Sequence, residues 1–219
     1  MRRATMLASA LLATVLYAAQ GRAQVGRRGQ VRASPDYWVG LSYGYMDGAT
    51  MVDGGTGATW QFGYSSQIRA TIEKSLQPGI AAGLSGGFST APLTYSGAGF
   101  NTACGGSCRA DADITQWLLF LRGGGGGSRG YGFHGDFDLE GGFTTFSNFR
   151  EHSTSVSLPS TSHYDPTFGF GGELSYSLSP TVDIYVGEVA DWVLHPQGDN
   201  VTASAPRVYT FRVGGRVGF

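Results

Sequence analysis

The sequence predicts an all-β protein, an eight-stranded up-and-down antiparallel transmembrane β-barrel. Apolar residues recur at every second position in long segments after residue 36, and short turns alternate with longer polar connections. Because successive side chains of a strand point to opposite faces of a sheet, a two-residue repeat indicates strands. Charged residues make up 14% of the 219 residues, below the roughly 25% of a soluble domain. The 36 glycines argue against a helical protein, since each glycine destabilises a helix interior by about 1 kcal/mol.

The N-terminus has the features of a secretory signal peptide. Arg2 and Arg3 precede an apolar stretch from Met6 to Ala19, and small residues follow it. We predict a signal peptide over 1–23, a periplasmic lead-in over 24–35 and the barrel over 36–219. The apolar stretch is shorter than the about 20 residues of a membrane-spanning helix, and no later segment approaches that length. A chain of this kind can cross a membrane only as a closed barrel.

Eight segments carry the two-residue repeat. They are 37–45, 60–76, 80–88, 114–122, 131–143, 168–178, 182–194 and 208–219. In the last segment Phe211 and Val213 belong to the apolar face, and Arg212 and Arg216 to the other. The segment 182–194 departs from the pattern because Glu188 falls on its apolar face. A β-bulge would exchange the two faces from the bulge onward.

The connections between these segments alternate in length. Residues 77–79 and 179–181 are tight turns, and 123–130 is a glycine-rich turn. The other connections are longer and polar: 47–59, 96–112, 147–165 and 195–207. Short turns at one end and long loops at the other are typical of outer-membrane barrels, whose long loops face outward.

The apolar face of the repeats carries too many large rings for the interior of a small barrel. The rings in question are Trp60, Phe62, Tyr64, Tyr131, Phe133, Phe137 and Phe143. Eight strands enclose a space just wide enough for side chains. We therefore predict that the rings face lipid and that the small and charged side chains face the lumen. Lys74 falls on the lipid face near a turn, where its amine can reach the headgroups.

The predicted lumen face holds ionisable side chains of both signs. They are Arg69, Glu73, His134, Asp136, Asp138, Glu140, Glu173, Asp183, Arg212 and Arg216. Unpaired charge in a low-dielectric interior is costly, so we expect opposite charges to pair and to fill the lumen. The alternative is a narrow pore with a weak preference for cations, because acidic residues outnumber arginines in this set.

Cysteines and histidines offer few further candidates. Cys104 and Cys108 are separated by Gly-Gly-Ser, and export favours a disulfide between them over a redox or metal pair. His152, His163 and His195 fall in predicted outer loops as solvated side chains, without the spacing of metal ligands. We expect no metal and no cofactor. A net charge of -1 gives no reason to expect a nucleic acid as partner.

The C-terminal residues 212–219 resemble the terminal β-signal of outer-membrane barrels. Arg212, Gly214, Val217 and Phe219 fill its polar, glycine, hydrophobic and final aromatic positions. This resemblance implies recognition by the barrel-assembly machinery. With the signal peptide, the alternation and the loop asymmetry, the mature chain resembles the OmpA/OmpX-like eight-stranded outer-membrane β-barrel family. The resemblance implies a monomer in the cell outer membrane, in contact with outer-membrane lipid.

A structural or loop-mediated role follows as the predicted function. The loop around 150–164 is the candidate for an extracellular ligand that the sequence does not name. An outer-membrane enzyme that modifies lipid or cleaves polypeptides is the competing class. His134 and Asp136 share one face as a base and its orienter, but no serine lies two positions away on that face. We therefore assign no catalytic residue and do not expect an enzyme.

Overall fold

The computed structural model describes residues 35–97, 106–124, 132–160, 164–196 and 205–219. The predicted signal peptide and nearly all of the lead-in fall outside these ranges, as do Cys104, Tyr131 and His163. The predicted disulfide therefore stays a prediction. The strands are β1 (Tyr37–Met46), β2 (Thr50–Val52), β3 (Ala58–Phe62), β4 (Ser65–Gln77), β5 (Ile80–Gly97), β6 (Ser107–Gly124), β7 (Gly132–Glu151), β8 (Tyr164–Ser179), β9 (Val182–Val193) and β10 (Arg207–Gly218).

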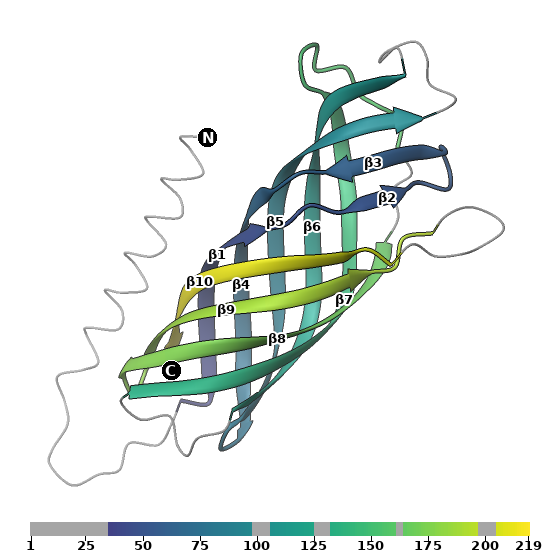
Figure 1. The fold of residues 1–219 in the computed structure, drawn as a ribbon. Helices are drawn as coiled ribbons and strands as arrows, with labels where there is room; N and C mark the ends of the chain where they lie inside the picture. The colour runs from purple at the N-terminus through teal and green to yellow at the C-terminus, as the bar shows by residue number, and fades with distance from the viewer. Residues whose placement is uncertain (1–34, 98–105, 125–131, 161–163, 197–204) are drawn as a thin grey trace, which may run out of the picture.

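The strands close into one antiparallel barrel (Figure 1). Neighbours along the chain pair from β4 through β10, and β1 pairs with both β4 and β10 to complete the ring. The short β2 follows β1 and pairs with β3, and β3 pairs with β5 above the β4–β5 ladder. Two of the eight walls of the barrel are thus each built from two strands, β1 with β2 and β3 with β4. The predicted eight-stranded up-and-down barrel is confirmed.

β5, β6 and β7 are adjacent and are the longest strands of the barrel. β5 and β6 each have 18 residues and β7 has 20, against 12 in β9 and in β10. Figure 1 shows them rising past the ends of β9 and β10 on the side where the long connections lie. Crossing a membrane at a tilt takes about 9–11 residues per strand. The surplus residues form a wall that projects past the rest of the barrel, and the predicted loops 96–112 and 147–165 are correspondingly shorter.

The outer surface of the barrel is apolar, as the repeats predict. Large side chains that point outward and are at least a third exposed include Tyr43, Ile68, Ile72, Phe88, Trp117, Leu119, Phe133, Phe137, Phe170, Leu174, Ile184, Phe211 and Val213. Aromatic pairs gather toward the two ends of the strands: Tyr37 stacks on Phe219 at 6.2 Å, and Tyr45 on Tyr64 at 5.4 Å. Such a surface is suited to hydrocarbon with aromatic girdles at its borders.

The predicted orientation of Trp60 and Phe62 is wrong. Both side chains are buried inside the barrel, whereas Tyr64 is 65% exposed on the outside. From the pair Phe62–Leu93 to the pair Gln67–Ser89, the β3–β4 wall advances five residues while β5 advances four. This one extra residue, at the break around Gly63, reverses the two-residue repeat. Above the break the even positions face inward, and below it the odd positions do.

A second bulge lies near the top of β7. Asp113 pairs with Ser147 and Asp111 with Arg150, so β7 has one more residue here than β6. Asn148 takes up the extra residue with φ 54°, a left-handed conformation that asparagine tolerates better than most residues. As a result Phe146 and Phe149, three residues apart, both point into the barrel.

The bulge that we considered for 182–194 is not present in β9; in the β8–β9 ladder the extra residue lies on β8, between Ser177 and Ser179. β9 pairs with β10 without interruption from Val182 to Trp192, and the inward residues stay at odd positions. Glu188 therefore remains on the outer, apolar surface.

Candidate functional site

The interior of the barrel has two layers of side chains. The lower layer, near the short turns, is a polar network contributed by inward positions of β4 and β6 to β10. The upper layer, toward the long connections, is an apolar cluster from β1 to β3, the upper halves of β5 to β7 and the ends of β9 and β10. The interior is therefore polar in one half of the barrel and apolar in the other, because the inward positions of the strands hold ionic side chains in the lower half and apolar side chains in the upper half.

Arg122 joins three walls of the barrel. Its Nε donates to Asp138 Oδ1 at 2.7 Å and its Nη2 to Asp138 Oδ2 at 3.1 Å. Its Nη1 donates to Glu73 Oε2 at 2.8 Å, and Nη2 also reaches Glu173 Oε2 at 3.2 Å. The planar guanidinium suits such forked contacts with carboxylates.

Arg216 forms a second centre below Arg122. Its Nε donates to Asp183 Oδ2 at 3.0 Å and its Nη2 to Asp136 Oδ2 at 3.2 Å. Its Nη1 lies 2.7 Å from Glu173 Oε1. Glu173 therefore bridges Arg122 and Arg216, which makes the two arginines parts of one network.

Arg69 and Arg212 connect this network to an uncharged layer above it. Arg212 Nη2 donates to Asp138 at 2.7 Å, and Arg69 Nη1 donates to Glu140 at 2.7 Å. Arg69 Nη2 also donates to Gln116 Oε1 at 2.9 Å, and Gln67 Nε2 donates to the same oxygen at 2.8 Å. These amides stand at the boundary between the charged side chains and the apolar cluster.

All ten side chains that we predicted for the lumen network point into the barrel. Nine of them contact an opposite charge within 3.9 Å through the ion pairs above, and His134 lies 3.7 Å from Asp136. We missed Arg122 and Asp191. Arg122 is the last residue of a predicted strand that is otherwise almost entirely apolar. Asp191 lies in 182–194, where Glu188 made the assignment of the two faces uncertain. Both could have been identified, because each stands at an inward position of the alternation in its strand.

Carboxylates outnumber guanidinium groups in this buried network. The four arginines are Arg69, Arg122, Arg212 and Arg216, and the seven carboxylates are Glu73, Asp136, Asp138, Glu140, Glu173, Asp183 and Asp191. Asp191 is the least well paired: Arg69 Nη2 lies 3.8 Å away, and neither carboxylate oxygen accepts a hydrogen bond. With every group ionised, the network has a charge of 4 − 7 = −3.

The apolar cluster centres on Trp60, whose side chain is fully buried. The rings of Phe149, Phe146 and Phe62 have their centroids 4.5, 6.0 and 6.4 Å from the Trp60 ring. Around them pack Met46, Met51, Ala58, Ala91, Leu93, Tyr95, Ala110, Ala112, Ile114, Leu158, Val193 and Val208.

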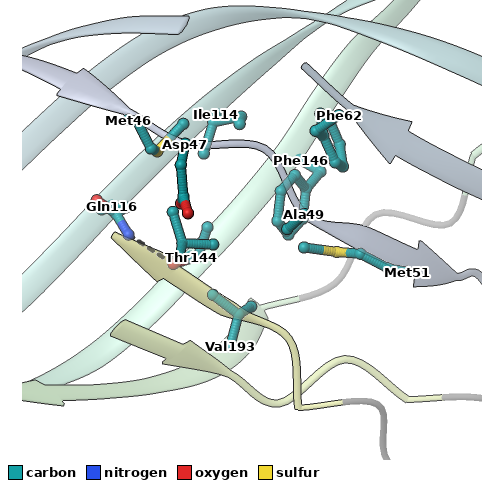
Figure 2. Close-up of a pocket in the computed structure, with 11 residues that line it drawn as sticks. Met46, Asp47, Ala49, Met51, Phe62, Ile114, Gln116, Thr144, Phe146 and Val193 are labelled. Carbon is teal, nitrogen blue, oxygen red and sulfur yellow. Dashed lines mark hydrogen bonds between the residues drawn. The ribbon is translucent and has the colours of Figure 1, made fainter. Parts of the chain in front are cut away.

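A small cavity separates the cluster from the amide layer (Figure 2). Met46, Phe62, Ile114 and Phe146 line its apolar side, and Gln116 and Thr144 line the other. Its volume of about 20 Å³ is room for one or two water molecules. A cavity of this size does not hold an organic ligand.

His195 is not the solvated loop residue that we predicted. It is buried beside the apolar cluster, its ring 5.0 Å from that of Trp60, and its Nδ1 lies 2.7 Å from Asp165 Oδ2. Asp165 is the second residue of β8 and His195 follows the end of β9, so this contact fixes the base of the connection 195–207 at the upper end of the barrel. His152 is exposed, and its Nδ1 lies 2.9 Å from Asp111 Oδ2.

The projecting end of β7 closes in a tight polar turn. Glu151 accepts hydrogen bonds from the backbone N–H groups and the hydroxyls of Ser153 and Thr154, at 2.5 to 3.1 Å. The hydroxyls of Thr154 and Ser153, with their amides, lower the pKa of Glu151 to about 2. Leu158, from the segment after this turn, packs into the apolar cluster and ties the turn to the barrel.

His134 has carboxylates around it and no nucleophile bound to it. Its Nε2 lies 3.7 Å from Asp136 and 3.9 Å from Asp183 and forms no hydrogen bond. The nearby Ser175 and Ser177 donate to Glu173 and Asp183 at 2.9 and 2.7 Å. Within the described ranges, no three His, Cys, Asp or Glu side chains form a group that could hold a metal.

The closed barrel, with its apolar exterior and polar lower interior, defines the class as the eight-stranded outer-membrane β-barrels. Comparison with solved structures shows the same fold in Neisserial surface protein A, with a TM-score of 0.54 at 11% identity over 86% of this chain and 100% of that one. OprG from Pseudomonas aeruginosa aligns over 85% of this chain and 96% of its own with a TM-score of 0.49 and 16% identity. No protein-family model matches the sequence, and no curated protein matches it significantly.

The chain accordingly has the fold of the eight-stranded outer-membrane β-barrels. Identities this low carry the fold alone, so the role of the barrel has to come from its own side chains.

Proposed function

We propose that this protein is an outer-membrane barrel whose lumen is closed by its own side chains and which acts through its structure or through its outer connections. The observation that carries this proposal is the stacking of the two interior layers. An ion crossing the barrel would have to disrupt paired arginines in the lower layer and then enter an apolar layer centred on Trp60.

Both layers resist opening for physical reasons. Separating one partner of a buried ion pair costs about 3–5 kcal/mol, and each of the four arginines contacts at least two carboxylates. The apolar layer offers an ion no compensation for its lost hydration. Small barrels of eight strands are commonly filled by side chains, which agrees with this arrangement.

The outer connections are the favoured place for a binding role. The projecting wall of β5, β6 and β7 carries polar outward side chains, and Thr90 and Asn148 donate to Asp113 at 2.7 and 2.8 Å. Recognition surfaces usually lie on loops that a rigid scaffold positions. We propose that this wall and the segment around 150–164 contact the extracellular ligand, while the apolar exterior contacts outer-membrane lipid.

Conductance in a planar lipid bilayer tests the closed lumen. The purified mature protein should insert without steady single-channel current. A steady current that is lost in Glu73→Gln or in Arg212→Ala would overturn the proposal, because both side chains belong to the interior network. An unboiled sample on a detergent gel, which migrates differently from a boiled one, provides the check that the inserted protein is folded.

A narrow cation-preferring pore is the second candidate, and the excess of buried carboxylates favours it. Seven carboxylates against four arginines would attract cations and repel anions if water entered the lower layer. Reversal potentials in a KCl gradient would identify this function: a cation preference in the wild type that falls in Asp191→Asn supports the pore, and zero current rejects it.

A further inference from the structure

Glu188 lies in the centre of the membrane-facing surface. β8 and β9 place their outward side chains in five successive pairs: Tyr176–Ile184, Leu174–Val186, Gly172–Glu188, Phe170–Ala190 and Phe168–Trp192. The glutamate belongs to the third pair. At its upper end this series stops at Trp192, which stacks on Phe168 at 5.6 Å, and at its lower end at Tyr176, which packs edge-on against Phe133 at 4.8 Å.

The carboxyl group cannot reach either membrane border from this position. Four residues separate it from each end of the series, which is about 13 Å along the strand and about 10 Å in depth at a tilt near 40°. Long lysine and arginine side chains reach the headgroups from shallow positions, but a glutamate side chain is too short to do so from mid-depth. Among the described residues, Glu188 has no hydrogen bond and no ion pair.

An ionisable side chain at this depth is expensive unless a polar partner meets it. Acidic side chains within the membrane are rare for this reason, and those that occur usually pair with another polar group. Other charged side chains on the exterior lie away from the middle of the barrel: Lys74 is near the tight turn 77–79, Arg207 begins β10, and Asp113 is in the upper half of β6 on the projecting wall. The exception at Glu188 therefore needs an explanation of its own.

The surface around Glu188 permits close approach of another molecule. Gly172 stands directly beside it on β8, and a Cβ there would meet nothing closer than 3.8 Å. Ala190 is the next outward residue on β9 and is almost completely covered. On the other side the Phe211 ring is half exposed. The carboxyl group thus has a neighbour without a side chain on its β8 side, and small residues allow proteins to pack closely in membranes.

We propose that β8 and β9 form the interface of a dimer in the membrane, in which Glu188 of one copy hydrogen-bonds Glu188 of a second copy. A protonated carboxyl donates and a carboxylate or second carboxyl accepts, so the group is complementary to itself. A two-fold axis that passes beside Glu188 brings this residue against its own copy, so that no other partner has to supply a polar group in lipid. The dimer replaces the monomer expected from the family resemblance.

Sedimentation equilibrium of the refolded mature chain in density-matched micelles tests the dimer. The wild type should form a reversible dimer, and Glu188→Gln should retain it because an amide also donates and accepts. Glu188→Leu should raise the dissociation constant at least tenfold. Gly172→Leu should weaken the dimer as well, because it places a bulky side chain beside the carboxyl group and leaves that group in place.

Leu84→Ala is the matched control. β5 lies four strands from β9 in both directions around the barrel, so this exposed residue faces away from the proposed interface. Its substitution should leave the dissociation constant unchanged, and the gel shift on boiling should show that every variant is folded. A wild type that is monomeric at all protein-to-detergent ratios, a Glu188→Leu variant that dimerises as tightly as the wild type, or loss of the dimer in Glu188→Gln would each overturn the proposal.

Discussion

Arg122 and Asp138 face each other across the β6–β7 ladder and form two nearly parallel hydrogen bonds of 2.7 and 3.1 Å. The third guanidinium nitrogen of Arg122, Nη1, donates to Glu73 on β4, two walls of the barrel away from β6. A single guanidinium therefore links strands that no backbone ladder joins. This makes Arg122 the side chain on which the pairing of the lower interior most depends.

Replacement of Arg122 by methionine should destabilise the barrel by about 3–5 kcal/mol, because it leaves buried carboxylates without their counter-charge. Methionine keeps most of the length and apolar volume of the side chain, so the loss reports on charge more than on packing. The measurement is the free energy of unfolding by urea in lipid vesicles, followed by tryptophan fluorescence.

Arg207→Met is the control for that measurement. Arg207 is exposed and lies over the ring of Tyr209 at 4.6 Å, outside the interior network. Its loss should cost no more than about 1 kcal/mol, the range of an exposed cation–π contact. Equal effects of the two substitutions would mean that the interior ion pairs contribute nothing particular to stability.

Phe62 and Phe211 should respond differently to the same substitution. Phe62→Ala should cost about 3–5 kcal/mol, because the ring is enclosed by Phe146 and other apolar side chains that cannot fill the space it leaves. Phe211→Ala should cost clearly less, since lipid chains can occupy the vacated volume on the outside. Urea unfolding of both variants compares them directly, and an equal or larger loss for Phe211→Ala would contradict the inward position of Phe62.

The sequence predicted most of the fold because the alternation is regular over most strands. From Phe168 to Leu178, and from Val208 to Phe219, every residue faces the side that its parity predicts. The lumen side chains of β7 and β10 followed from the same rule. Assigning side chains to a face by odd or even position assumes that the pairing between strands is uninterrupted. The assignment fails wherever one strand has an extra residue relative to its neighbour.

Trp60 is the residue for which that assumption failed, whereas Phe149 fell in the predicted loop 147–165 because β7 continues to Glu151. The extra residue near Gly63 turns Trp60 and Phe62 inward, and the extra residue at Asn148 turns Phe149 inward, so the apolar cluster could not be read from the alternation. Conversely, the apparent irregularity at Glu188 suggested a bulge where the ladder is continuous. A bulge depends on pairing between strands, and the sequence of one strand does not contain that information.

Trp60 and Trp117 should differ in their access to lipid. Trp60 is enclosed in the apolar cluster, whereas the Trp117 ring is half exposed on the outer wall of β6. We expect lipids brominated along their acyl chains to quench the fluorescence of Trp117 strongly and that of Trp60 weakly. Two variants that retain only one of these tryptophans, with phenylalanine at the other tryptophan positions, allow the comparison. Similar quenching of both would place Trp60 on the outside, as the simple alternation predicts.

The turn after β7 should depend on pH through Glu151. The hydrogen bonds of Ser153 and Thr154 favour the ionised carboxylate and lower its pKa from 4.5 to about 2. A depressed pKa in the folded state means that the carboxylate stabilises the turn fully above pH 4.5. This contribution is lost as the pH falls through about 2.

Carbon-13 NMR of the Glu151 carboxyl group in micelles should give a titration midpoint near pH 2, and the amide shift of Thr154 should follow the same curve. In Ser153→Ala with Thr154→Ala, the hydroxyl donors are removed while the backbone donors stay, so the midpoint should move upward toward 4.5. A wild-type midpoint already near 4.5, or one that the double substitution leaves unchanged, would show that these hydroxyls do not hold the carboxylate in solution. Because Leu158 anchors the following segment in the apolar cluster, the strands should keep their pairing throughout this titration and only the turn should loosen.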